Sequence, residues 1–345
     1  MKILLVTAMY PTPESPAFGS FVKTQAESLR RAGVDVEVFR ISGRNQKLSY
    51  GKAILEVRRR VKRGDIDLIH AHYSFAGIVA RMQRKVPVVV TYHGDDLLGT
   101  VAPSGNKTSW SVAVVAMGKI LARFIDAAIV QNVEMASKIS NANVRILPHE
   151  VDLDVFRPTE KDQARAELGL AKDKKYLLFA ADPRISVKRF PLAKASADLL
   201  ARRDPLVELL VVCKESQQRL ALHMSACDAL VFPSYQEGSP NIVKQAMACN
   251  LPIVATDVGD VREVVGQTEG CYICNPVVGE FTGALNEILK TCRRTNGREH
   301  VRHLNPSAVA EKLIQVYKDA IARHQTPARA ASRTTFFAPS NQTRN

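Results

Sequence analysis

The stretch ALVFPSYQEGSPNIVKQAMA, residues 229–248, determines how we interpret the rest of the chain. It begins with an apolar run that predicts a buried strand and ends with the apolar periodicity of a helix. Ser239 is a favourable N-cap residue and Pro240 suits the first helical position, so we expect the helix to begin there. Glu237 then lies in a strand-to-helix loop beside free backbone N–H groups, which attract anions. With Gln245 about one and a half turns further along, this arrangement suits a sugar bound through a phosphate, although an ordinary capped helix with a solvated Glu is the alternative.

Length and composition indicate a two-domain globular protein. The chain has 345 residues, of which 46% are hydrophobic and 24% charged, and domains of this class usually hold 100–150 residues. No stretch has the roughly 18 consecutive apolar residues that a membrane span needs. The apolar run at Ile3–Met9 is too short for a signal peptide, and the six cysteines are scattered. We therefore expect a cytoplasmic protein, and we expect no metal site at the isolated C-x-x-C of Cys271 and Cys274.

The net charge of +14 comes mainly from the first half of the chain and from the tail. Such an excess predicts an anionic partner, which could be a membrane surface, a phosphorylated substrate or a nucleic acid. Arg58–Arg63 are the most basic part of a predicted helix, which is either a solvated face or a peripheral contact with anionic lipid. No zinc knuckle or aromatic–basic pattern accompanies them, so we do not expect nucleic-acid binding.

Strands and helices alternate along the chain, which predicts two doubly wound α/β domains with parallel sheets. The domains are 1–158 and 159–305, followed by a closing helix at 306–324 and a tail at 325–345 that we predict to be disordered. Ligands bind such sheets at the C-terminal ends of the strands. If the two domains face each other, these edges form one central cleft. The predicted strands are 3–9, 34–41, 66–70, 88–91, 127–130 and 144–147, then 176–180, 208–212, 229–232, 253–256 and 272–273.

Candidate site residues in the first domain follow its strands. Gly19 could allow backbone to approach a diphosphate, although the chain has neither G-x-G-x-x-G nor Walker A spacing, and a plain turn is the alternative. His72 and His93 follow two strands and could face the cleft, whereas alternation places His70 in the core. Asp95, after His93-Gly94, could accept a hydrogen bond from a sugar hydroxyl.

The loop after the first strand of the second domain carries the candidate cations. Arg184 and Lys188 could neutralise a diphosphate, Arg through a bidentate fork and Lys as a point charge. Arg189 competes for either role, and a solvated basic turn is the alternative explanation.

Several motifs together resemble the GT-B glycosyltransferases of family 4, which are retaining sugar-nucleotide transferases. The likeness covers roughly residues 1–324 and is nearest to exopolysaccharide and teichuronic-acid-type bacterial enzymes. It implies two Rossmann-like domains, no required metal or other cofactor, and a final helix that crosses back to the first domain. The residues that carry it are Asp67–His72, Val90–Asp95, Ile146–Pro148, Val151, Asp152, Phe156, Glu237–Asn241 and Ala246–Asp260.

The resemblance also implies roles for single residues. Gly19 would face the donor diphosphate, His93 would lie by the sugar, and Arg184 and Lys188 would neutralise the leaving diphosphate. Glu237 would contact the sugar, and the backbone of Gly238, Ser239, Pro240 and Asn241 would hold sugar and phosphate. Position 245 would hold the ribose.

Several departures from the family pattern touch the donor side, among them the displaced Gly and Arg after the first strand of the second domain and the loop Cys213–Glu215, which lacks the expected Gly. Gln245 stands where the family has Glu, and His149-Glu150 stands where it has Asn-Gly. We predict a retaining transferase that moves a hexose from a nucleotide diphosphate to a polysaccharide or lipid-linked acceptor, at the inner face of the cell membrane or in the cytoplasm. The departures leave two alternatives, a nucleotide-sugar epimerase of the same fold and a non-catalytic binding protein.

Overall fold

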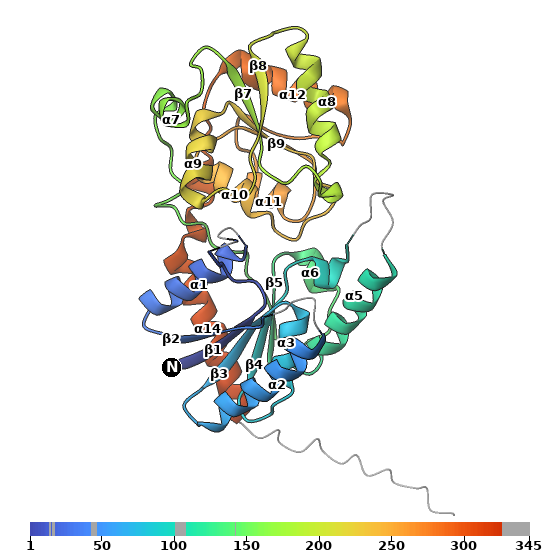
Figure 1. Cartoon of the computed structure of the whole chain (residues 1–345), viewed down its shortest axis with the longest axis vertical. Helices are drawn as coiled ribbons and strands as arrows, with labels where there is room; N and C mark the ends of the chain where they lie inside the picture. The colour runs from blue at the N-terminus through green and yellow to red at the C-terminus, as the bar shows by residue number, and fades with distance from the viewer. Residues whose placement is uncertain (14, 16–17, 43–46, 101–107, 142, 326–345) are drawn as a thin grey trace, which may run out of the picture.

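The computed structural model describes residues 1–13, 15, 18–42, 47–100, 108–141 and 143–325, so all but the first residue of the predicted tail lies outside them. The described chain forms two lobes, one above the other, and each contains a parallel sheet covered by helices (Figure 1). The predicted α/β class with two doubly wound domains is confirmed. Among the described residues, no helix combines the length and the apolar character that crossing a membrane requires.

The N-terminal lobe is built on a six-stranded sheet of order β2-β1-β3-β4-β5-β6. The strand order reverses between β1 and β3, so the loops after these strands diverge and leave a crevice at the sheet edge. The predicted candidate Gly19 lies on the loop after β1, and the predicted candidate His72 is the last residue of β3. The strands are β1 Lys2–Thr7, β2 Asp35–Arg40, β3 Leu68–His72, β4 Val88–Thr91, β5 Ala127–Val130 and β6 Val144–Ile146. The helices are α1 Ser20–Arg31, α2 Lys47–Lys62, α3 Ser74–Arg81, α4 Asp95–Leu98, α5 Ser109–Ala122 and α6 Val133–Ser137.

The C-terminal lobe contains a five-stranded sheet of order β11-β10-β9-β7-β8. Its strand order reverses between β7 and β9, which places the loops 180–188 and 233–241 at the crevice. The strands are β7 Lys175–Phe179, β8 Val207–Val211, β9 Ala229–Phe232, β10 Ile253–Ala255 and β11 Cys271–Ile273. The helices are α7 Lys161–Leu168, α8 Phe190–Ala201, α9 Gln217–Ala226, α10 Asn241–Ala248, α11 Val261–Val265, α12 Val278–Thr291 and α13 Gly297–His300, with 3-10 turns η1 Ser186–Lys188 and η2 Arg302–Leu304.

Both faces of the N-terminal sheet are buried, which explains why its strands are apolar throughout instead of alternating. On β1, Leu4 and Val6 pack with residues of α2 and α3, while Ile3 and Leu5 pack on the opposite face with residues of α1 and the last helix. Residues i and i+2 of a strand share one face, so β1 serves two cores.

The last helix, α14 (Pro306–Gln325), lies beside α1 in the N-terminal lobe, although it follows the C-terminal lobe in sequence (Figure 1). Its buried side chains include Leu313, Val316 and Tyr317, which recur at helical spacing and share a cluster with the first strand. The Tyr317 hydroxyl lies 2.7 Å from Nδ1 of His70. His70 is therefore a buried, bonded core residue, as its position in the strand predicts.

Candidate active site

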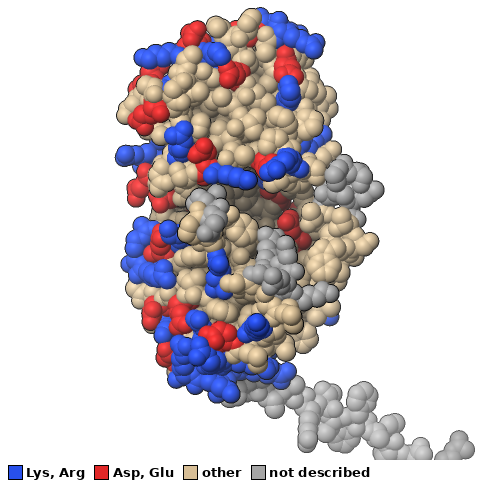
Figure 2. Space-filling view, in the orientation of Figure 1, with Lys and Arg blue, Asp and Glu red and all other residues tan. Residues whose placement is uncertain are grey.

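Two adjoining cavities lie where the lobes meet. The larger has a volume of about 360 Å³ and the smaller about 320 Å³, and both are lined by His93, Lys188 and Glu237. Figure 2 shows this junction as a hollowed region with basic and acidic residues at its edge. The loops after β1, β4, β7 and β9 reach this region, so the sequence argument for one cleft between the two sheet edges matches the observed arrangement.

Glu237 and Lys188 form an ion pair inside the cleft, with Oε1 2.6 Å from Nζ. Their side chains are 16% and 25% exposed, so each is partly shielded from water and still reachable by a ligand. Lys188 ends the 3-10 turn η1, and Glu237 lies in the loop between β9 and α10. The two loops of the C-terminal sheet edge thus bring one cation and one anion together.

The start of α10 differs from the prediction in one respect. The helix begins at Asn241 with Pro240 at the N-cap position, and no side chain caps it. Ser239 is not the N-cap, because its hydroxyl donates to the Asp260 carboxylate instead. A charged acceptor makes a stronger hydrogen bond than a backbone group does. The first N–H groups of α10 are therefore left without a side-chain cap beside Ser239, Pro240 and Asn241, which line the larger cavity.

The two glycine turns predicted to face each other are in van der Waals contact. A Cβ atom added to Gly238 would lie 3.2 Å from the His93 carbonyl oxygen and 3.3 Å from Cα of Gly94. Gly259 supports the turn from behind: its φ is +61°, and a Cβ there would lie 2.4 Å from the Gly238 oxygen. Asn132 donates to that same oxygen from the N-terminal lobe. Glycine at these positions permits the close approach of the lobes.

Three histidine rings form a row across the junction. Nε2 of His93 lies 3.2 Å from Nδ1 of His72, and Nδ1 of His93 lies 3.1 Å from Nε2 of His149. His93 stacks on both rings, and Phe21 packs against His93 and His149. Burial lowers the pKa of His93 to about 3 and the pKa values of His72 and His149 well below the usual value. The three rings are therefore neutral at physiological pH.

Of the two predicted cleft histidines, only His93 lines the cavities. His72 is completely buried behind it, so its expected position facing the cleft is wrong. The reason is its strand: β3 extends to His72, two residues further than the predicted strand. His149, which is only 7% exposed, forms the other end of the row and lines the larger cavity.

The loop that carries His93 is held by a carboxylate that the sequence argument did not single out. Asp96 is completely buried, and its Oδ1 accepts hydrogen bonds from the backbone N–H groups of His93 and Gly94 at 2.9 and 3.2 Å. Burial raises the pKa of Asp96 to about 7. Its neighbour Asp95 is exposed and lines the smaller cavity, where the expected hydroxyl contact would be made. The adjacent pair Asp95-Asp96 was the available signal. Two neighbouring residues in the first turn of a helix point in different directions, so one of the two carboxylates faces inward.

A buried lysine on α10, the helix whose start lines the larger cavity, was also missed. Lys244 of α10 is completely buried, and its Nζ lies 3.4 Å from the His149 carbonyl oxygen and 3.4 Å from Oδ1 of Asn241. Burial lowers its pKa to about 8. The available signal was its register in the helix. Lys244 lies three and four residues before the apolar Met247 and Ala248, so it shares their buried face.

The other predicted donor residues lie further from the cleft centre. Arg184 points into solvent with its side chain 80% exposed, makes a bidentate pair with Asp182, and lines neither cavity. Arg189 lies over the ring of Tyr235 at 4.0 Å. Gln245 lines neither cavity. The loop after β7 turns at η1 so that Lys188, and not Arg184, reaches the site.

Gly19 has a structural reason to be glycine. Its φ is +73°, and a Cβ would lie 2.4 Å from the backbone carbon of Met9, which lines the larger cavity. Gly19 thus allows the loop after β1 to fold closely against the start of α1. The plain-turn alternative and the donor-facing role are both compatible with this position.

His149-Glu150, another of the departures from the family pattern, fastens the inter-lobe linker to α1. Glu150 is buried, and its Oε1 accepts a hydrogen bond from the Ser28 hydroxyl at 3.0 Å. Burial raises the pKa of Glu150 to about 8. His149 packs on Phe21 of the same helix. The two residues therefore belong to the lobe junction itself.

Two facing Rossmann-like lobes with a charged cleft between them have the architecture of the GT-B glycosyltransferases. Residues 4–151 match the glycosyl transferase 4-like domain family and residues 176–291 match the glycosyl transferases group 1 family. The chain belongs to these glycosyltransferases, because the two matches cover the sheets of both lobes.

Among curated proteins, the chain is 25% identical to a Bacillus subtilis glycosyltransferase named for teichuronic acid biosynthesis, TuaC, over 79% of this chain and 85% of that protein. It is 26% identical to the D-inositol 3-phosphate glycosyltransferase of Mycolicibacterium smegmatis, over 84% of this chain and 77% of that protein.

Solved structures show the same fold. Sucrose-phosphate synthase from Thermosynechococcus elongatus superposes with a TM-score of 0.77 at 21% identity, covering 94% of this chain and all of that one. Anabaena HepE in complex with UDP superposes with a TM-score of 0.67 at 16% identity, covering 92% of this chain and 100% of that one.

Proposed function

We propose that this glycosyltransferase transfers a hexose from a nucleoside diphosphate sugar to a hydroxyl of a polysaccharide or lipid-linked glycan, with retention of the anomeric configuration. The observation that carries the proposal is the Lys188–Glu237 pair beside the uncapped start of α10, inside a cavity shared by both lobes. This combination offers a cation and backbone N–H groups to a diphosphate and a carboxylate to a sugar.

The chemistry follows from the charge that develops during transfer. Cleavage of the anomeric C–O bond places negative charge on the diphosphate oxygen that leaves. Lys188 and the N–H groups at the start of α10 would stabilise that charge, which is the kind of preorganised electrostatic effect that contributes most to many enzymes. Glu237 would orient the sugar by accepting hydrogen bonds from its hydroxyls.

Retention can arise by double displacement or by attack on the same face as the departing group. Glu237 is the carboxylate that lines both cavities, and its Oε1 lies 2.6 Å from Nζ of Lys188. Such pairing lowers the nucleophilicity of a carboxylate, so we favour same-face attack in which the leaving phosphate accepts the proton of the acceptor hydroxyl.

The names of the similar proteins support a nucleotide-sugar donor and a polysaccharide acceptor. One is named for teichuronic acid biosynthesis, and another was solved with UDP. We further propose that no metal is needed, since Lys188 and the α10 start can balance the diphosphate. In the described ranges, no group of three His, Cys, Asp or Glu side chains could hold a metal ion.

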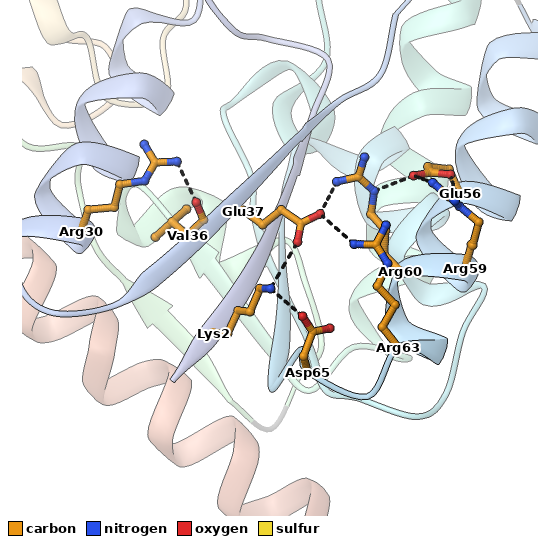
Figure 3. A network of polar contacts seen from close by, with 9 residues as sticks. All are labelled: Lys2, Arg30, Val36, Glu37, Glu56, Arg59, Arg60, Arg63 and Asp65. Carbon is orange, nitrogen blue, oxygen red and sulfur yellow. Dashed lines mark hydrogen bonds and ion pairs between the residues drawn. The ribbon is translucent and has the colours of Figure 1, made fainter.

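We also propose peripheral contact with anionic membrane through α2. Figure 2 shows Lys and Arg gathered at the lower end of the N-terminal lobe. Figure 3 shows that several of these cations are already paired: Arg60 contacts Glu37 and Glu56, and Lys2 contacts Asp65 and Glu37.

The apolar residues of α2 support this contact more directly. Leu48 and Leu55 are 83% and 67% exposed and lie seven residues apart, so they share one face of α2 with exposed cations nearby. Anionic vesicles should bind the protein at low salt and release it at high salt, because exposed charge interactions are screened. Equal binding to neutral vesicles would contradict the proposal.

A thermal-shift screen against UDP-, GDP-, ADP- and dTDP-sugars tests the donor. A ligand that binds only the native state raises the melting temperature, by an amount set by its concentration relative to Kd. We expect one nucleotide class to stabilise the protein and its sugar to be transferred or slowly hydrolysed. Release of an epimerised sugar would favour an epimerase, and binding without turnover would favour a non-catalytic protein.

A further inference from the structure

We propose that His149 is a donor-binding residue, whose Nδ1–H group donates a hydrogen bond to the diphosphate of the sugar nucleotide. This inference rests on the proposed nucleotide-sugar donor. The sequence marks His149 only as a departure from the family pattern and gives it no role. It lies in the linker between the lobes and lines the larger cavity together with Lys188 and Glu237.

The row of rings couples the protonation of its members. Each N···N contact, at 3.2 Å between His72 and His93 and 3.1 Å between His93 and His149, needs one N–H donor and one bare nitrogen. A neutral imidazole carries one N–H. If His93 donates from Nδ1, then His72 donates from Nδ1 as well and His149 accepts at Nε2. If His93 donates from Nε2, all three rings carry the proton on Nε2.

The buried end of the row selects between these two sets. Nε2 of His72 is buried and has no hydrogen-bond partner among the described residues. In the Nε2–H set it would be a buried N–H group without an acceptor, which native structures rarely tolerate. In the Nδ1–H set it is only an unused lone pair. The Nδ1–H set is therefore favoured for all three rings.

The consequence appears at the His149 end of the row. With Nε2 of His149 accepting from His93, its single N–H is on Nδ1, on the edge of the ring that faces away from His93. Within the described chain, no residue accepts a hydrogen bond from this Nδ1 group. Phe21 and His93 pack against the ring and fix its plane. His149 lines the same cavity as Lys188, so its Nδ1–H is a rigid neutral donor that a ligand bound there can engage.

A diphosphate oxygen is the ligand group that best suits this donor. Hydrogen bonds from a neutral N–H to an ionised oxygen are stronger than neutral pairs. The Lys188 cation and the start of α10 already favour an anion in the same cavity. The donor on His149 would therefore contact the same diphosphate from the N-terminal lobe.

The decisive test compares nucleoside diphosphate with nucleoside monophosphate binding by calorimetry, with UDP and UMP as the first pair and the GDP and ADP pairs after it. His149→Phe keeps an aromatic ring for the stack on Phe21 and His93 but removes the N–H. We expect it to weaken diphosphate binding about tenfold or more and to change monophosphate binding by less than about twofold. His149→Gln, which restores an N–H donor, should recover part of the loss.

His303→Phe is the matched control, since His303 lines a separate cavity of about 220 Å³, and it should bind both nucleotides like wild type. Equal losses for the two nucleotides in His149→Phe, or no loss, would overturn the inference. Failure of wild type to bind any nucleoside diphosphate would instead overturn the proposed donor, and the inference with it.

The tautomers can be read in wild type even if the variants fold poorly. ¹⁵N spectra of histidine-labelled protein should show the Nδ1–H form for His72, His93 and His149, and addition of the bound diphosphate should shift the His149 Nδ1 signal most. The Nε2–H form, or a His149 signal that does not respond, would contradict the inference.

Discussion

The two lobes line the larger cavity with different kinds of residue: uncharged side chains on the N-terminal side and an ion pair on the C-terminal side. The N-terminal lobe contributes Met9, Phe21, His93 and the linker His149, all uncharged at neutral pH. The C-terminal lobe contributes the Lys188–Glu237 ion pair and the start of α10. The charged groups therefore come from one lobe, while the other offers rigid neutral rings.

The difference indicates a division of labour. Groups that stabilise developing charge gain most when they are fixed in a partly shielded site. The residues of the N-terminal lobe that line the cavity are uncharged, so they do not compete with the ligand for ion pairs with Lys188 or Glu237. We therefore expect substitutions on the C-terminal wall to act on transfer rate and those on the N-terminal wall to act on binding and on the junction.

Among the substitutions on the C-terminal wall, Glu237→Gln should reduce the transfer rate most. It removes the carboxylate that pairs with Lys188 and that we propose to contact the sugar, so we expect kcat to fall by about 100-fold or more. The measurement is donor turnover with the fold checked by circular dichroism. Glu287→Gln, which breaks an exposed ion pair with Lys290 on α12, is the control and should leave turnover unchanged. Near-normal turnover of Glu237→Gln would remove this residue from the site.

Lys188→Met and Arg184→Met test which cation serves the diphosphate. Lys188 lines both cavities, whereas the exposed Arg184 is paired with Asp182. We expect kcat/KM to drop about 10- to 100-fold for Lys188→Met, since tenfold corresponds to about 1.4 kcal/mol, and to stay within about threefold for Arg184→Met. The reverse ranking would mean that the loop after β7 rearranges around the donor.

Gly259→Ala tests whether the glycine turn must be held between the lobes. Gly259 has a φ of +61°. Gly169 is the matched control, because its φ of +69° is similar but a Cβ there would meet no atom within 4 Å. Gly169→Ala should therefore cost only the left-handed backbone strain, about 1–2 kcal/mol, with turnover retained. Gly259→Ala adds the clash with the Gly238 oxygen and should cost about 2 kcal/mol more and impair turnover. Equal behaviour of the two variants in denaturation and turnover would contradict this support role.

Glu150→Gln should change stability in a pH-dependent way. The pKa of Glu150 is raised to about 8 in the fold, above about 4.3 when unfolded. Protonated Glu150 therefore favours the fold below pH 4.3, and wild type loses this advantage as pH rises towards 8. The variant mimics the protonated form, so its stability relative to wild type should rise by about 3.5 kcal/mol between pH 5 and pH 8. Denaturant unfolding at both pH values measures this, with the exposed Glu311→Gln as control; a difference that does not grow with pH would contradict it.

Much of the fold could be predicted from the sequence because apolar strands buried on both faces leave a plain signal. The runs around Leu5, Val89 and Leu230 lie in the observed strands. The turn at Glu237–Asn241 and the His93-Gly94 loop were also placed opposite each other correctly, since both follow strands of parallel sheets.

The remaining details depend on contacts between lobes, which no local pattern encodes. Ser239 looked like a helix cap, but Asp260 from a later loop takes its hydroxyl. Arg184 and Lys188 lie on one short loop, and only its 3-10 turn decides which of them faces the cleft. The row from His72 to His149 joins residues far apart in sequence, so its geometry required the folded chain.

The most direct test of the central claim is a crystal structure with the nucleoside diphosphate that most raises the melting temperature. The account predicts the diphosphate in the larger cavity, with one oxygen within hydrogen-bond distance of Lys188 Nζ and another facing the first N–H groups of α10. A diphosphate bound elsewhere, for example in the cavity beside Gln131 and His303, would contradict it.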